Sequence, residues 1–242
     1  MTLNFGNNLF PPRGEVITSY DYSDFSNGLG YGIYYGFNNA GTLGISTKSL
    51  VYSGIRHIND AELDIDGTQT FTEILDKDFD ITFNTPKNIK GDILVVVPFG
   101  IMNSEDAANT ALDTFYKCEL SIFHYNGSTE TQMGSTITSE IKKVGDAITN
   151  TIYSHISTLK CNISTIKHFK IGETLRITLK IYIKHSGNGG GFREFIAGLG
   201  CDPQNRTDIG AGTDQGFPTD NQIITTNEPT KIEFHIPFKL EI

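Results

Sequence analysis

Four carboxylates in one short stretch have the residue type and spacing of a metal site. Asp60, Glu62, Asp64 and Asp66 alternate along the chain, so an extended backbone places all four on one face. Ca²⁺ binds several oxygen ligands arranged in this way, which makes the stretch a candidate calcium site. The complete EF-hand pattern is not met, and a solvated acidic edge that discourages strand pairing between molecules has the same composition. We therefore favour an acidic edge, expect no cofactor, and keep Ca²⁺ as the alternative.

The other residue types that do chemistry are scattered along the chain. The six histidines are never paired at metal-ligand spacing, and the three cysteines form no CxxC pair. No Gly-x-Ser-x-Gly motif is present. The GLGYG run at residues 28–32 lacks the preceding apolar strand and the following helix of a nucleotide-binding loop. With no catalytic residues to name, we expect that the protein is not an enzyme.

The composition indicates a globular protein of 242 residues. Hydrophobic residues make up 38% and charged residues 19% of the chain, and there are 25 glycines and no tryptophan. The net charge of −9 argues against direct nucleic-acid binding, because phosphate affinity comes from clustered Lys and Arg. No stretch approaches the ~20 apolar residues of a membrane span. We expect neither a nucleic-acid partner nor a membrane span.

Alternation of apolar and polar residues predicts long strands with one buried face. The clearest examples are residues 173–185 and 230–242, and we expect their inward side chains in the core: Leu175, Ile177, Leu179, Ile181, Phe234, Ile236 and Phe238. About ten such strands predict an all-β fold, an antiparallel two-sheet β-sandwich of jelly-roll type. A short helix is expected at 104–108, and long loops at 53–68, 98–113 and 186–227.

Two strands have patterns that set their expected ends or shape. Residues 93–97 are apolar on both faces, which predicts a central strand bounded by Gly91 and Pro98. In residues 148–163 the apolar parity changes between Ile156 and Leu159, which predicts a β-bulge near Thr158.

The first 45 residues differ from the rest because glycines interleave with aromatic residues. Glycine at this density does not favour a helix, and the aromatic rings need a surface to cover. We expect residues 1–45 to form an extended N-terminal arm that lies on the body or on a neighbouring subunit and adds little to the core. Residues 46–242 are expected to form a single domain. The arm's aromatic residues are Tyr20, Tyr22, Phe25, Tyr31, Tyr34, Tyr35 and Phe37.

Four stretches together resemble β-rich, jelly-roll-like virion structural proteins of tailed phages and archaeal viruses. They are residues 26–37, 172–184, 198–208 and 231–242. The resemblance implies a non-enzymatic structural subunit of a virus particle, as a capsid, capsid-decoration or tail-associated protein. It also implies synthesis in the host cytoplasm, a final place in the virion, and copies of itself and other virion proteins as partners.

A binding module is the alternative. Residues 192–227 combine Gly, Asp and Asn with the isolated aromatics Phe195 and Phe217, which suits a loop that contacts sugars. A carbohydrate- or receptor-binding β-sandwich module at a virion or cell surface, with a surface glycan as its partner, fits the same sequence.

Overall fold

The computed structural model describes residues 18–19, 29–39, 42–46, 57–59, 63–64, 70–103, 113–144, 152–186, 194–203 and 231–239. Within these residues the chain forms strands, turns and bends, and no helix. The strands are β1 (Thr18–Ser19), β2 (Leu29–Asn39), β3 (Thr42–Ser46), β4 (His57–Asn59), β5 (Leu63–Asp64), β6 (Thr72–Thr82), β7 (Lys87–Asn103), β8 (Asp113–Tyr125), β9 (Glu130–Gln132), β10 (Ile137–Thr138), β11 (Lys142–Val144), β12 (Ile152–Phe169), β13 (Thr174–Ser186), β14 (Glu194–Gly200) and β15 (Glu233–Lys239).

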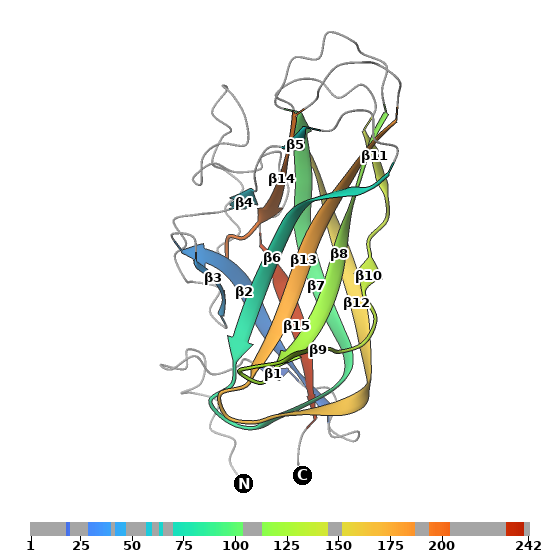
Figure 1. Ribbon diagram of the computed structural model, residues 1–242. Helices are drawn as coiled ribbons and strands as arrows, with labels where there is room; N and C mark the ends of the chain where they lie inside the picture. The colour runs from blue at the N-terminus through green and yellow to red at the C-terminus, as the bar shows by residue number, and fades with distance from the viewer. Residues whose placement is uncertain are drawn as a thin grey trace.

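The strands make two antiparallel sheets that face each other (Figure 1). Sheet A has nine strands in the order β1-β2-β15-β7-β14-β4, with β3 also paired to β2, β12 to β7 and β5 to β14. Sheet B has six strands in the order β10-β8-β13-β6, with β9 and β11 also paired to β8. The predicted all-β, antiparallel two-sheet sandwich is therefore confirmed, whereas the jelly-roll type stays a prediction.

Side chains that alternate along the long strands fill the space between the sheets. The inward residues of β13 and β15 are buried, with 9% of Phe238 exposed and none of the others: Leu175, Ile177, Leu179, Ile181, Phe234, Ile236 and Phe238. Rings from opposite sheets meet in the core, where the centroids of Phe79 on β6 and Phe234 on β15 are 5.4 Å apart. Burying one side chain of this size contributes about 1.5–3 kcal/mol, so these contacts hold the two sheets together.

Strand β7 runs past both of its expected ends. At Gly91 the backbone has φ of 115°, a conformation that glycine tolerates. The pairing of β7 with β12 shifts register between Ile89 and Gly91, and its pairing with β15 shifts between Ile89 and Leu94. Pro98 lies where pairing with β15 has ended at Val96 and pairing with β14 has yet to begin at Phe99. A proline lacks the N–H that a ladder needs, and this gap between two neighbours lets the strand accommodate it.

Strand β12 has no bulge at Thr158, which corrects the sequence-based expectation. Its pairing with β7 is continuous from Ile152 to Ile163, and the register shifts only beyond Ile163. Every second side chain from Leu159 back to His155 therefore points into the sandwich, and the ring of His155 lies 5.9 Å from that of Phe99. Ile156 faces outward and is half-buried beside Pro98 of β7.

Parts of all three expected loops are strands. Short β4 and β5 lie within residues 53–68, the end of β7 lies within 98–113, and β14 lies within 186–227. All of these segments add to sheet A, where β14 joins β7 to β4 and β5. The expected helix at 104–108 and the aromatic Phe217 lie outside the described residues.

Strand β2 belongs to the core, so the expectation that residues 1–45 add little to it is wrong for Leu29–Asn39. This strand pairs with β15 along Leu29–Tyr35, and Tyr34 is 4% exposed. Gly36 donates its N–H to the carbonyl of Ile232 at 3.2 Å, and a Cβ at Gly36 would lie 3.1 Å from Phe79 Cε1. Gly36 thus allows two core rings to approach the backbone. Apart from Thr18–Ser19, residues 1–28 lie outside the described part.

Candidate functional site

The outer face of sheet B carries a polar network across β6, β13 and β8. The register places acidic residues of β6 opposite polar residues of β13: Asp80 opposite Arg176, Asp78 opposite Thr178, Asp76 opposite Lys180 and Glu73 opposite Tyr182. All of these point outward because the residues between them on β13 fill the core. The candidate site here is a charged surface built from residues about 100 positions apart in the sequence.

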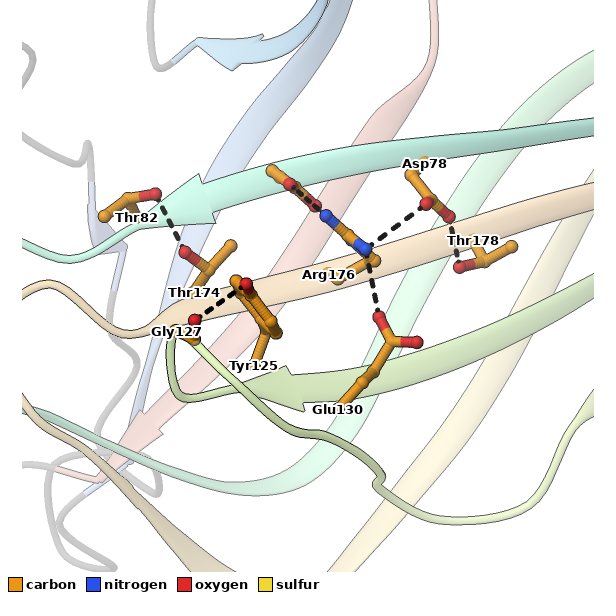
Figure 2. Close-up of polar contacts among 9 residues, drawn as sticks. Asp78, Thr82, Tyr125, Gly127, Glu130, Thr174, Arg176 and Thr178 are labelled. Carbon is orange, nitrogen blue, oxygen red and sulfur yellow. Dashed lines mark hydrogen bonds and ion pairs between the residues drawn. The ribbon is translucent and has the colours of Figure 1, made fainter.

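Arg176 is the centre of this network (Figure 2). Its Nε and one terminal nitrogen each donate a 2.8 Å hydrogen bond to the carboxylate of Asp80. Its other terminal nitrogen lies 3.1 Å from Glu130 Oε1 and 3.5 Å from Asp78 Oδ2. Asp78 also accepts a 2.6 Å hydrogen bond from the Thr178 hydroxyl. The hydrogen bonds to Asp80 raise the pKa of Arg176 above its usual range, so the guanidinium stays charged.

Lys180 repeats the arrangement two rows further along β13, beyond Thr178. Its Nζ lies 2.7 Å from Asp76 and 3.0 Å from Glu73, and the hydrogen bond to Asp76 raises the pKa of Lys180. The Tyr182 hydroxyl donates to Glu73 at 3.2 Å, and burial is the main cause that raises the pKa of Tyr182 to about 12. The carboxylates of β6 are therefore paired within the sheet.

The aromatic rings on this face already hold cations. Lys117 Nζ lies 4.9 Å from the ring centroid of Tyr182, and Arg176 lies 5.5 Å from that of Tyr125. Lys184 lies 5.9 Å from the centroid of Phe115. A sugar that stacks on an aromatic face would have to displace these cation–π contacts. The outer face of sheet B is thus a surface whose charges and rings satisfy one another.

The outer face of sheet A has a different composition. Leu94 and Val96 alternate with buried residues of β7 and point away from the core, where both are half-buried. The register through β15 puts Ile33 of β2 in the row of Leu94, and Tyr35 of β2 in the row of Val96. Ile156 of β12 lies opposite Pro98, next to Val96. We call Ile33, Tyr35, Leu94, Val96 and Ile156 the apolar band.

One charged group crosses the apolar band on β15. Glu233 accepts hydrogen bonds from Lys231 at 2.7 Å and His235 at 3.0 Å. Burial acts to raise the pKa of Glu233, but these two hydrogen bonds outweigh it and hold the pKa below its usual range. Lys231 also lies 5.0 Å from the ring centroid of Tyr35. The charge in the apolar band is therefore matched locally.

The structure places the sequence-predicted site residues in several environments. Asp60, Glu62 and Asp66 lie outside the described residues, and Asp64 lies in β5 opposite Glu194, so the calcium alternative stays a prediction. Of the aromatic residues assigned to the arm, Tyr20, Tyr22 and Phe25 lie outside the described part, Tyr34 is in the core, and the half-buried Tyr31, Tyr35 and Phe37 alternate with buried residues on β2.

The described residues contain neither a metal-binding cluster nor a membrane-spanning helix. No group of three or more His, Cys, Asp or Glu residues among them is placed to hold a metal ion. In the same part of the chain, no helix is long and apolar enough to cross a membrane.

The Arg176 network was missed by sequence reasoning. Asp76, Asp78 and Asp80 alternate in the sequence, as do Arg176 and Lys180, which marks each set as one strand face. That signal gives the two faces but not their pairing, which depends on β6 lying beside β13.

Comparisons with known proteins give distant similarities only. No family model and no curated protein matches the sequence. Among solved structures, the chain is similar to a CocE/NonD family hydrolase from Staphylococcus aureus, with 12% identity over 70% of this chain and 36% of that chain and a TM-score of 0.36. It is also similar to the VP2 subviral particle of infectious bursal disease virus, with 10% identity, 77% and 35% coverage and a TM-score of 0.26.

A third similarity is to Eiger TNF from S. frugiperda, with 10% identity over 76% of this chain and 98% of that chain and a TM-score of 0.25. The chain spans about a third of the length of the hydrolase and VP2 chains. The similarity to a viral capsid protein is thus real but distant, and at these TM-scores none of the three carries an argument about function.

Proposed function

We propose that this chain is a non-enzymatic structural subunit of a virus particle, a capsid, capsid-decoration or tail-associated protein that assembles with copies of itself. The observation that supports it best is the apolar band on sheet A, which no described strand covers. Burying apolar surface lowers the free energy by about 25 cal/mol for each Å² removed from water. A second copy that covers this band would therefore stabilise the pair of copies. Stable interfaces bury about 800 Å² on each partner, an area that the apolar band and its rim would help to supply.

The contrast between the two outer faces favours sheet A as the contact. On sheet B, burying Arg176, Lys180 and their carboxylates would remove water from charges that already have partners. On sheet A, a partner meets half-buried aliphatic and aromatic side chains beside two locally matched charged groups, Glu233 with Lys231 and Lys160 with Asp92. Assembly through sheet A therefore has a lower desolvation cost than assembly through sheet B.

The virus-particle part of the proposal rests on the sequence resemblance. Two of the four resembling stretches, residues 26–37 and 231–242, contain β2 and β15, which are neighbours in sheet A. A third, residues 172–184, contains most of β13, the middle strand of sheet B. The resemblance thus lies largely in the strands that form the sandwich.

The alternative function is a carbohydrate- or receptor-binding module. The cations that cover Tyr125, Tyr182 and Phe115 weigh against the outer face of sheet B as its sugar site. The alternative then depends on residues 204–227, which lie outside the described part.

Size-exclusion chromatography with light scattering on the full chain separates the two functions. The structural subunit gives oligomers whose mass rises with concentration. A monomer at every concentration, together with saturable binding on a glycan array, would contradict the proposal and favour the binding module.

A further inference from the structure

A groove separates the two sheets at one edge of the sandwich. It has a volume of about 380 Å³ and lies between β10 of sheet B and β12 of sheet A, which run side by side in Figure 1. Its lining consists of residues 137–140 and residues 155–159. Alternate residues of a strand point to opposite faces, so consecutive residues line a groove together only where the edge of the strand faces it. The groove is therefore bounded by strand edges.

The edge of β12 that faces the groove has no strand partner among the described residues. Strand β12 pairs with β7 along its whole length, and β9, β10 and β11 pair with β8. In an antiparallel ladder every second residue directs its N–H and C=O toward the same edge. The groove thus exposes a row of backbone donors and acceptors, which is a template for one more strand.

Beyond the groove, β12 contacts the segment that precedes β10 at Gly134. Here the thiol of Cys161 donates to the carbonyl of Ser135 at 3.4 Å, and a Cβ at Gly134 would lie 2.8 Å from Cys161 Sγ. The two edges touch at this point, which lies outside the residues that line the groove. The five residues of β12 that line the groove correspond to about 16 Å of extended chain.

This edge lacks the usual protection against pairing. Natural edges are guarded by lysines, prolines or bulges. Residues 155–159 contain no lysine or proline, and their register with β7 is continuous. The adjacent Lys160 is held by Asp92 of β7 at 2.6 Å, on the outer face of its own sheet. The groove is therefore open to an added strand, as in other cases of strand addition at a sheet edge.

We propose that the groove receives the N-terminal segment, residues 2–10, of a second copy of this chain, of which about five residues add a strand along the edge of β12. Seventeen residues precede β1, and β1 and β12 lie at opposite edges of sheet A, with β2, β15 and β7 between them. The segment therefore starts on the side of the sheet away from its own groove. Each copy has a donor at one edge and an acceptor at the other, the arrangement that links copies head to tail into rings or rows.

The sequence of this segment suits the role. Leu3 and Phe5 alternate with polar residues, and Pro11 and Pro12 end the run before the chain reaches β1. Residues 11–17 then serve as a linker of up to about 24 Å. This inference rests on the proposed self-assembly and adds to it the site that receives the N-terminal segment.

Cysteine cross-linking of full-length chains tests the inference. One chain carries Asn4→Cys and a second, differently tagged chain carries Thr158→Cys, an exposed residue that lines the groove. The matched control carries Ser128→Cys, in an exposed turn between β8 and β9. The native thiols of Cys118, Cys161 and Cys201 are buried with no exposed surface and do not compete. Mild oxidation should give a reducible dimer of Asn4→Cys with Thr158→Cys, at least tenfold more abundant than with Ser128→Cys.

Three other outcomes would overturn the inference. In a double Asn4→Cys, Thr158→Cys chain, a cross-link within one molecule would show that the groove takes its own N-terminal segment. Assembly detected by light scattering without a preference for Thr158→Cys would leave the proposed function standing and exclude this groove as the receiving site. A monomer without any cross-link would contradict both.

Discussion

Arg176 and Asp80 face each other across β13 and β6 and share two hydrogen bonds of 2.8 Å. The two residues are 96 positions apart, and the pair joins directly opposed positions of the two strands. The paired geometry, with Glu130 and Asp78 also within 3.5 Å, distinguishes it from an ordinary surface ion pair.

The first prediction is that Arg176→Ala lowers the free energy of unfolding by about 1 kcal/mol. Both side chains are about one-third exposed, so solvent screening keeps the loss near the upper end for surface pairs. Urea unfolding measures it, and a double-mutant cycle with Asp80→Ala isolates the pair. A coupling energy of zero in that cycle would show that the two hydrogen bonds add nothing to stability.

The second prediction concerns Gly36 and the place of β2 in the core. An alanine Cβ at this position would lie 3.1 Å from Phe79 Cε1 and 3.3 Å from Phe234 Cε2. Gly36→Ala should therefore cost about 1–3 kcal/mol through overpacking. Thermal melting checks this against Ser128→Ala in an exposed turn, which should be nearly neutral. Equal melting temperatures for the two variants would contradict the packing of β2 in the core and favour a surface arm.

Residue patterns predicted the sandwich because its long strands bury one face. The alternation from Leu175 to Ile181 and from Phe234 to Phe238 follows directly from that geometry, and the structure has both as strands. Gly36 misled the prediction because glycines among aromatic residues are typical of an exposed arm as well as of a tightly packed strand. Pairing with β15 decides between the two, and a single sequence does not contain that pairing.

The same limit applies to strand ends and to the candidate sites. Pro98 looks like a strand end in sequence, yet it lies inside β7 because the neighbour on that edge changes from β15 to β14. The groove beside β12 and the Arg176 network both depend on which strands lie side by side. Neither could be found from residue types and spacing alone.

The third prediction is a pH dependence that arises from Glu173. Its carboxylate accepts hydrogen bonds from the Lys170 N–H at 2.8 Å and from His124 at 2.7 Å, and these lower the pKa of Glu173. Because the folded pKa lies below the unfolded value of about 4.3, this stabilisation is fully present above that value. It is lost as the pH falls through the folded pKa.

Glu173→Gln provides the measurement for this effect. The variant should be less stable than the parent at neutral pH, and the difference should shrink as the pH falls below about 4. Glu140→Gln, a change at an exposed residue that is paired with Lys142, gives the background for losing a surface charge. A difference between Glu173→Gln and the parent that stays constant with pH would contradict the assignment.

The fourth prediction is that salt strengthens assembly. Each copy carries a net charge of −9, so copies repel one another at low ionic strength. Contacts through the apolar band lose little from screening, whereas the repulsion falls as the Debye length shortens. Sedimentation at rising NaCl should show larger species. Dissociation at high salt would mean that ion pairs, and not apolar contacts, hold the copies together.

The most direct test of the account is light scattering of Leu94→Lys beside Ser121→Lys. Leu94 lies at the centre of the apolar band on sheet A, and Ser121 is half-buried on the outer face of sheet B. Both substitutions add one positive charge to an outward position, and thermal melting should show that both variants fold. We predict that Leu94→Lys remains a monomer at concentrations where the parent and Ser121→Lys form oligomers. Oligomers of equal mass for all three proteins would contradict assembly through the outer face of sheet A.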